Sequence, residues 1–207
     1  MAEQENLPEN TFPLDRLSGL SDGVIAIALT LLVLAIDIPA EHNFSRDGLK
    51  SFLIQLEPSI VAYISSFIIV AIYWMQHRAI FGTLKAANRI LLWLNLLFLF
   101  AISLAPFVSK LKTLYRFDID IVVIFSIMHI FSGMILLTMW RYVVKHTELQ
   151  RKTFNTAKTK NITLSILIVP IVCIVAFLVS LADIHLGTYT YAIVPIIYIF
   201  RRQLDDC

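Results

Sequence analysis

Residues 16–34 of the chain read RLSGLSDGVIAIALTLLVL. Apart from Arg16 and Asp22, every residue in this stretch is uncharged, and its length is close to the ~20 residues with which an α-helix crosses ~30 Å of hydrocarbon. An ionisable side chain at membrane depth is costly and is retained where it faces a bundle interior or water and has a partner. The stretch therefore predicts a first transmembrane helix whose Asp22 needs a partner from another helix.

Apolar runs of similar length follow along the whole chain. The composition, with 58% hydrophobic and 15% charged residues, lies outside what a soluble domain folds around one core. The expected transmembrane helices cover residues 17–38, 53–76, 90–109, 119–140, 161–182 and 186–200. The runs do not alternate apolar and polar positions as membrane β-strands do, so the fold class is all-α. We expect one six-helix domain over residues 1–207, and a tilted or re-entrant last helix is the alternative for the short final run.

The distribution of charged residues predicts how the chain is oriented in the membrane, and the net charge and the cysteines indicate which classes of partner are not expected. Twelve of the seventeen Lys and Arg residues lie at the two ends of the chain and in the second and fourth of the expected loops. By the positive-inside rule, both termini are predicted to be cytoplasmic. The net charge of +2 does not favour a nucleic-acid partner. Cys173 in an apolar run and Cys207 at the end favour neither a disulfide framework nor a thiolate metal site.

The first helix has two different faces. At about 100° per residue, four apolar side chains fall within about 60° of one another: Leu20, Ile27, Leu31 and Leu34. Asp22 points about 140° away from them. Only fourteen uncharged residues separate Asp22 from Asp37, or ~21 Å of helix, so we expect Asp22 to lie inside the protein. Arg16 is six residues from Asp22 and cannot be its neighbour on the same helix.

Partners for Asp22 are expected on the second and third helices, at the same level of the membrane. Trp74 and His77 share a face near the end of the second helix, and Asn88 or Asn95 lies at the start of the third. These polar side chains either form a network that acts in gating or hold three helices together. Both readings remain open at this point, and the two roles can coincide.

A motif on the first helix resembles a known family. An Arg-x-x-x-Phe-Ser-Asp pattern followed by Ile-x-x-Thr-Leu is typical of the transmembrane protein 175 family of endolysosomal and prokaryotic potassium channels. The matching residues are Arg16, Ser21, Asp22, Gly23, Ile27, Thr30 and Leu31. Leu20 stands where the family has phenylalanine, so the position is apolar but not aromatic. Animal members contain two six-helix units, and the single motif of this chain is similar to the prokaryotic type.

The resemblance implies a multi-pass channel in the plasma membrane of a prokaryote, in which four identical chains in the lipid bilayer surround a pore for potassium ions. It implies a pore lined by first helices, with Ile27 at the tightest hydrophobic constriction and Leu31 and Leu34 in wider rings. The motif residues that it supports as site residues are Arg16, Ser21, Asp22 and Thr30, and the helix spacing described above adds Trp74, His77 and Asn95 as candidates for the polar network. No cofactor and no resident metal is implied.

The expected selectivity is modest. The chain has no Thr-Val-Gly-Tyr-Gly loop whose carbonyl groups could replace the hydration shell of an ion. A hydrophobic constriction gates by dewetting and discriminates by the cost of removing water, which is lower for large, weakly hydrated cations. Potassium is therefore expected to pass more readily than sodium, and calcium is expected to be excluded.

Two other functions compete with the channel. A proton- or cation-coupled secondary transporter could use Asp22 and His77, with His129 as a further relay group. Against it, the two halves of the chain show no corresponding pair of Gly/Pro-interrupted segments. A membrane enzyme is not expected, because the chain carries no nucleophile motif, no H-E-x-x-H spacing and no phosphate-binding glycine loop.

Overall fold

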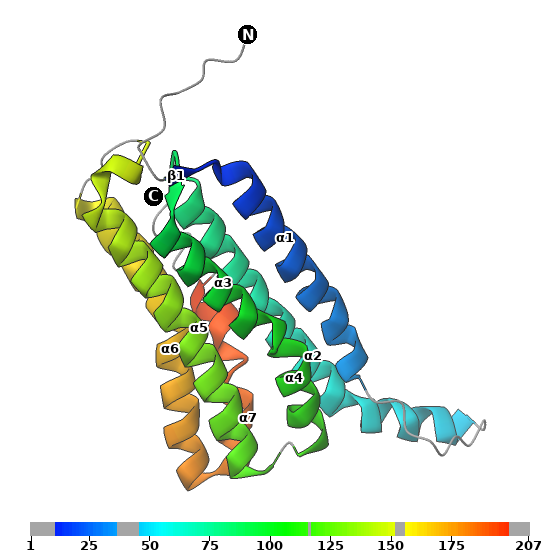
Figure 1. Ribbon diagram of the computed structural model, residues 1–207. Helices are drawn as coiled ribbons and strands as arrows, with labels where there is room; N and C mark the ends of the chain where they lie inside the picture. The colour runs from blue at the N-terminus through cyan, green and yellow to red at the C-terminus, as the bar shows by residue number, and fades with distance from the viewer. Residues whose placement is uncertain (1–10, 37–45, 116, 152–155, 199–207) are drawn as a thin grey trace.

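The computed structural model describes residues 11–36, 46–115, 117–151 and 156–198. It is a bundle of helices packed side by side along their lengths (Figure 1). Five spans in the described part are long and apolar enough to cross a membrane: Leu14–Ala35, Gly48–Phe81, Arg89–Leu114, Ile119–Lys145 and Thr159–Ala182. The predicted all-α class is confirmed. Besides the helices, the described part of the chain contains only two short strands.

The first span changes its helix type before it ends. Helix α1 (Leu14–Leu31) begins after Pro13 and continues as the 3-10 helix η1 (Leu32–Ala35). The expected range of 17–38 therefore begins three residues too late, and its last two residues lie outside the described part of the chain. One face of α1 is buried against α2 (Arg46–Phe81), α3 (Arg89–Ser103) and α4 (Ala105–Leu114), and the rest is open, because α1 lies at the edge of the bundle (Figure 1).

Three helices extend further than the apolar runs that predicted them. Helix α2 runs well beyond 53–76 at both ends, α5 (Ile119–Lys145) passes the expected end at 140, and α6 (Thr156–Ala182) begins before 161. A hydropathy limit marks where apolar side chains stop, whereas a helical backbone continues through polar residues until its hydrogen bonding is interrupted. The extra turns carry charged residues such as Lys145.

The third expected span is two helices. The helix expected over 90–109 lies within the single apolar span Arg89–Leu114, which is interrupted at Leu104, where α3 (Arg89–Ser103) ends and α4 (Ala105–Leu114) begins directly after it. Pro106 lies in the first turn of α4, where its missing N–H is tolerated, but it removes a donor that a continuous helix needs. The break lets α4 pack against η1 at the end of the first span.

The last expected span, 186–200, is also interrupted. Asp183 caps α7 (Ile184–Thr190), because its side chain accepts hydrogen bonds from the backbone N–H groups of His185 and Leu186. Helical backbone resumes at residue 193 and continues to 198, the end of the described range. In contrast, α6 continues through Pro170 without a break.

Three segments meet at one end of the bundle. Strand β1 (Thr11–Phe12) pairs antiparallel with β2 (Ala87–Asn88) in the connection between α2 and α3. The same connection meets the segment after η2 (Thr147–Leu149) through a bridge between Leu84 and Gln150. The chain entering α1 is thus tied to two interhelical connections, at the end of the bundle that charge predicts to be cytoplasmic (Figure 1).

One of the expected alternatives places Asn88 near Asp22. In the structure, Asn88 instead joins two helices at this end of the bundle. Its Oδ1 accepts a hydrogen bond from the backbone N of Leu91 at 3.0 Å and caps α3, and its Nδ2 donates to Tyr142 Oη at 2.6 Å.

We expect Asn88→Ala to lower the unfolding free energy in detergent by about 1–3 kcal/mol, since the cap and the link to α5 are both lost. Asn88→Ser, which retains a capping oxygen, should recover part of that loss. Equal stability of the alanine variant and wild type would contradict this account.

Candidate functional site

Three helices meet at a buried polar cluster formed by Ser21, His77 and Asn95. These side chains come from α1, α2 and α3, and their exposed fractions are 0%, 2% and 0%. Asn95 Nδ2 donates to Ser21 Oγ at 2.9 Å, and Asn95 Oδ1 lies 2.7 Å from His77 Nε2. The hydroxyl of Ser21 donates to the carbonyl of Leu17, one turn earlier on α1, at 2.8 Å. Every polar group in this cluster that faces another helix is therefore matched by a partner.

The cluster also determines the state of His77. Because Asn95 Oδ1 can only accept, His77 Nε2 must carry the proton in this contact. The imidazole stacks between Phe81 and Phe98, with ring centroids 4.1 and 5.4 Å away. Packing and hydrogen bonding together hold the ring in one orientation between α2 and α3.

Asp22 belongs to a second, more exposed group. Trp74 Nε1 donates to Asp22 Oδ1 at 2.8 Å, and the guanidinium carbon of Arg78 lies 5.4 Å from the centroid of the Trp74 ring. Asp22 is exposed in the single chain, so the expectation that it lies inside the protein does not hold for one subunit. Arg16 is exposed as well, and no ion pair joins it to the described residues.

This arrangement separates the groups that a proton relay would need. Asp22 bonds to Trp74 and His77 bonds to Asn95, so the two relay candidates are neighbours without a hydrogen bond between them. His129 lies on α5, and in the described part of the chain neither of its ring nitrogens has a hydrogen-bond partner. The geometry gives the transporter alternative no continuous path.

The apolar stripe of α1 (Leu20, Ile27, Leu31 and Leu34) faces away from the bundle. Ile27 is 60% exposed, Leu31 43% and Leu34 68%. Of the five candidate spans, the first is the least covered by the rest of the chain. In its most apolar 18-residue segment, 28% of the residues are buried, whereas the share in the other four spans is 39–56%. The stripe is thus the open side of the least covered span, available to lipid or to another subunit.

The change of helix type extends the stripe. Leu34 lies in η1, where three residues per turn place it directly above Leu31. Thr30 is exposed beside the stripe, but its hydroxyl donates to the backbone carbonyl of Ile27 at 2.8 Å. Its oxygen is therefore directed to its own helix, and the stripe carries no free hydroxyl donor from Thr30.

Sequence reasoning missed Arg78, although its spacing of four residues from Trp74 on a helix was a usable signal.

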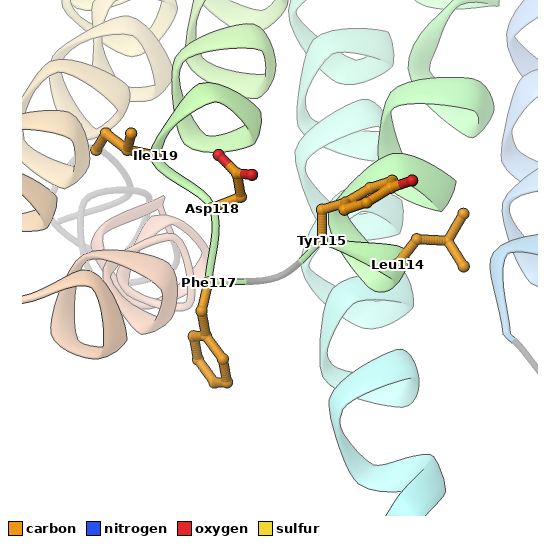
Figure 2. A pocket seen from close by; sticks show the side chains of 5 residues that line it. All are labelled: Leu114, Tyr115, Phe117, Asp118 and Ile119. Carbon is orange, nitrogen blue, oxygen red and sulfur yellow. The ribbon is translucent and has the colours of Figure 1, made fainter.

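A hollow of about 500 Å³ lies at the opposite end of the bundle, at the turn from α4 to α5 (Figure 2). It is lined by Leu114, Tyr115, Phe117, Asp118 and Ile119. None of the predicted site residues lies in it, and it is open to the surroundings.

Comparisons with known proteins match this arrangement. The family model for the endosomal/lysosomal potassium channel TMEM175 matches residues 16–106, which contain the stripe, the cluster and the Asp22–Trp74 bond. The chain is 41% identical over 95 residues to a potassium channel of Chryseobacterium sp. (strain P1-3) and 36% identical over 100 residues to one of Chamaesiphon minutus. These alignments span 46% of this chain and 46% of the first relative, and 48% of this chain and 49% of the second, so the chain spans about half the length of the curated relatives that it matches.

The similarity to a solved structure is more extensive. The crystal structure of a lysosomal potassium-selective channel TMEM175 homolog from Chamaesiphon minutus superposes with a TM-score of 0.75 at 25% identity. It covers 90% of this chain and 96% of that one. The motif, the bundle and the family model thus agree in showing that residues 16–106 of the chain are similar to the TMEM175 family.

Proposed function

We propose that the protein is a potassium-permeable channel whose pore is lined by α1 of each subunit in a homotetramer. The observation that carries the proposal is the open apolar stripe of α1 in a chain whose bacterial relatives are named potassium channels. The stripe lies on the least covered span, and the polar cluster fixes the orientation of that span against α2 and α3.

The surface of α1 suits assembly as well as conduction. By helix geometry, the stripe and Asp22 lie at the two margins of its exposed surface, with Gly19, Gly23 and Ala26 between them. A Cβ atom added at Gly19 or Gly23 would meet nothing within 4 Å in the single chain. Small residues let membrane helices approach closely, so a neighbouring subunit can pack there while the stripe turns toward a central axis.

Selectivity then arises from dehydration. The backbone carbonyls of α1 are bonded within the helix, and the stripe consists of Leu and Ile side chains, so an ion at Ile27 finds no substitute for its water shell. The larger, more weakly hydrated potassium ion loses its water at a lower cost than sodium. A modest preference for potassium and exclusion of calcium follow from this mechanism.

Reconstitution in liposomes tests the proposal. Under opposed potassium and sodium gradients, we expect a current whose reversal potential lies toward the potassium equilibrium potential and which needs no counter-ion flux. The mass in detergent should correspond to four chains of 23.6 kDa each. A fixed coupling ratio between two ion fluxes would identify a transporter instead, and a stable monomer that conducts would overturn the central pore.

Asp22 is expected to act in assembly and opening more than in ion choice. Asp22→Ala removes the acceptor for Trp74 Nε1, whereas Asp22→Asn retains an oxygen there and removes the charge. We expect Asp22→Ala to reduce the tetramer fraction and the macroscopic current several-fold, and Asp22→Asn to reduce them less. Both variants should leave the reversal potential near that of wild type. Trp74→Phe, which removes the donor and retains a smaller aromatic ring beside Arg78, is the control from the partner side and should resemble asparagine. A normally assembled Asp22→Asn tetramer that has lost selectivity would place Asp22 in the ion path.

A further inference from the structure

Lys112 lies buried at the end of the bundle opposite the polar cluster. It is in the last turn of α4 and only 5% exposed. Its Nζ lies 4.1 Å from the ring centroid of Phe125 on α5 and 4.0 Å from that of Tyr191, which follows α7. Within the described part of the chain, no carboxylate pairs with this ammonium group. A buried cation is thus held between two aromatic faces without a counter-ion from the described residues.

Other polar atoms near Lys112 also lack partners. His129 is one turn beyond Phe125 on α5, with its ring centroid 4.4 Å from that of Phe125, and it is fully buried. Neither His129 nitrogen has a hydrogen-bond partner among the described residues, and the same holds for Ser109 Oγ, one turn before Lys112 on the buried face of α4. The hydroxyl of Tyr191, in contrast, is bonded to Ser126 Oγ at 2.7 Å.

Together these groups offer more donors than acceptors. An ammonium group has three N–H donors and no acceptor, a neutral imidazole has one of each, and a hydroxyl has one donor and two lone pairs, and the positive charge is on the ammonium alone. Aromatic faces attract the ammonium but offer it no lone pair, and an unpaired buried charge is costly. A compact acceptor with one negative charge would match both the excess of donors and the unpaired charge.

We propose that Lys112 and His129 bind a small monovalent anion, of the size and charge of chloride, inside each subunit between α4 and α5. Ser109, whose Oγ has no hydrogen-bond partner among the described residues and which lies one turn before Lys112, is the further donor proposed from α4. The anion neutralises the ammonium and holds α4, which packs against η1, onto the bundle. The site is separate from the stripe of α1, and its existence does not depend on the proposed conduction.

Halide-dependent stability tests this site on the purified full-length protein. Thermal unfolding in detergent is followed at constant potassium concentration and ionic strength, with chloride, bromide or gluconate as the anion. We expect the Tm to rise by several degrees, and saturably, as chloride or bromide replaces gluconate. Lys112→Met retains the length of the side chain without its charge and should abolish the halide dependence. Lys110→Met, two residues away on the same helix, is the matched control and should retain it.

Crystals grown in bromide give an independent measurement on the wild-type protein, whose folding is not in question. An anomalous peak between Lys112 and His129 is expected. An unchanged Tm between chloride and gluconate, or a full halide effect that persists in Lys112→Met, would overturn the proposal. So would bromide crystals that show no anomalous peak beside Lys112.

Discussion

Replacement of Ile27 by asparagine is expected to raise single-channel conductance several-fold and to shift the reversal potential toward zero under opposed potassium and sodium gradients. In the proposed tetramer, four branched apolar side chains would be exchanged for smaller polar ones that keep water in the constriction. Lowering the barrier by about 1 kcal/mol corresponds to about a fivefold faster passage. Ile27→Ala should act in the same direction, because it widens the ring. Smaller effects of the same sign are expected at Leu31 and Leu34.

The control for this prediction is Leu29→Ala on the same helix. Leu29 points about 160° away from Ile27 and packs against the core of its own subunit. Its truncation should change conductance and ion preference little, although it removes some packing within the bundle. Single-channel amplitudes and reversal potentials are to be compared in one membrane system. If the Ile27 variants match wild type while Leu29→Ala alters the current, α1 is rotated from the proposed orientation and the stripe does not line the pore.

A large effect on stability is expected for Gly133→Ala, in the packing between α5 and α6. A Cβ atom at this position would overlap Cγ of Pro170 and lie 3.1 Å from its Cδ and 3.4 Å from Tyr73 Oη. The ring of a proline cannot swing aside as a flexible side chain does, so the two helices must separate. Overpacking of this kind typically costs about 1–3 kcal/mol, and α5 and α6 form the most extensive helix pair in the chain. A lower Tm and a lower yield of folded protein in detergent are the expected results.

Two further variants make this prediction specific. Gly19→Ala adds the same methyl group where no atom of its own chain lies within 4 Å, so any effect it has should appear in the tetramer fraction and not in the packing of α5 against α6. Gly133→Ala combined with Pro170→Ala removes the overlapping ring, and the double variant should regain much of the lost stability. Equal stability of Gly133→Ala and wild type, or a double variant no better than the single one, would show that the helices accommodate the methyl group in another way.

The polar side chains around α1 show which features of the site can be predicted from the sequence and which cannot. Helix spacing indicated that Ser21, Asp22, Trp74, His77 and Asn95 lie at one level of the membrane, because rise and rotation per residue are properties of the backbone alone. Which of them bond to each other depends on how three helices are rotated and displaced. The structure joins Asp22 to Trp74, and Asn95 to both Ser21 and His77.

Membrane class, all-α fold and five of the six apolar spans followed from the sequence alone, because the cost of exposing polar backbone to lipid acts on each apolar segment by itself. Pro106 was a local signal for the break at Leu104 that hydropathy does not register. The burial of Lys112 had no such signal. By sequence it is a charge near the end of an apolar run, and only the approach of Phe125 and Tyr191 from other helices encloses it. Long-range packing decides such positions, because the groups that surround a side chain come from segments remote in the chain.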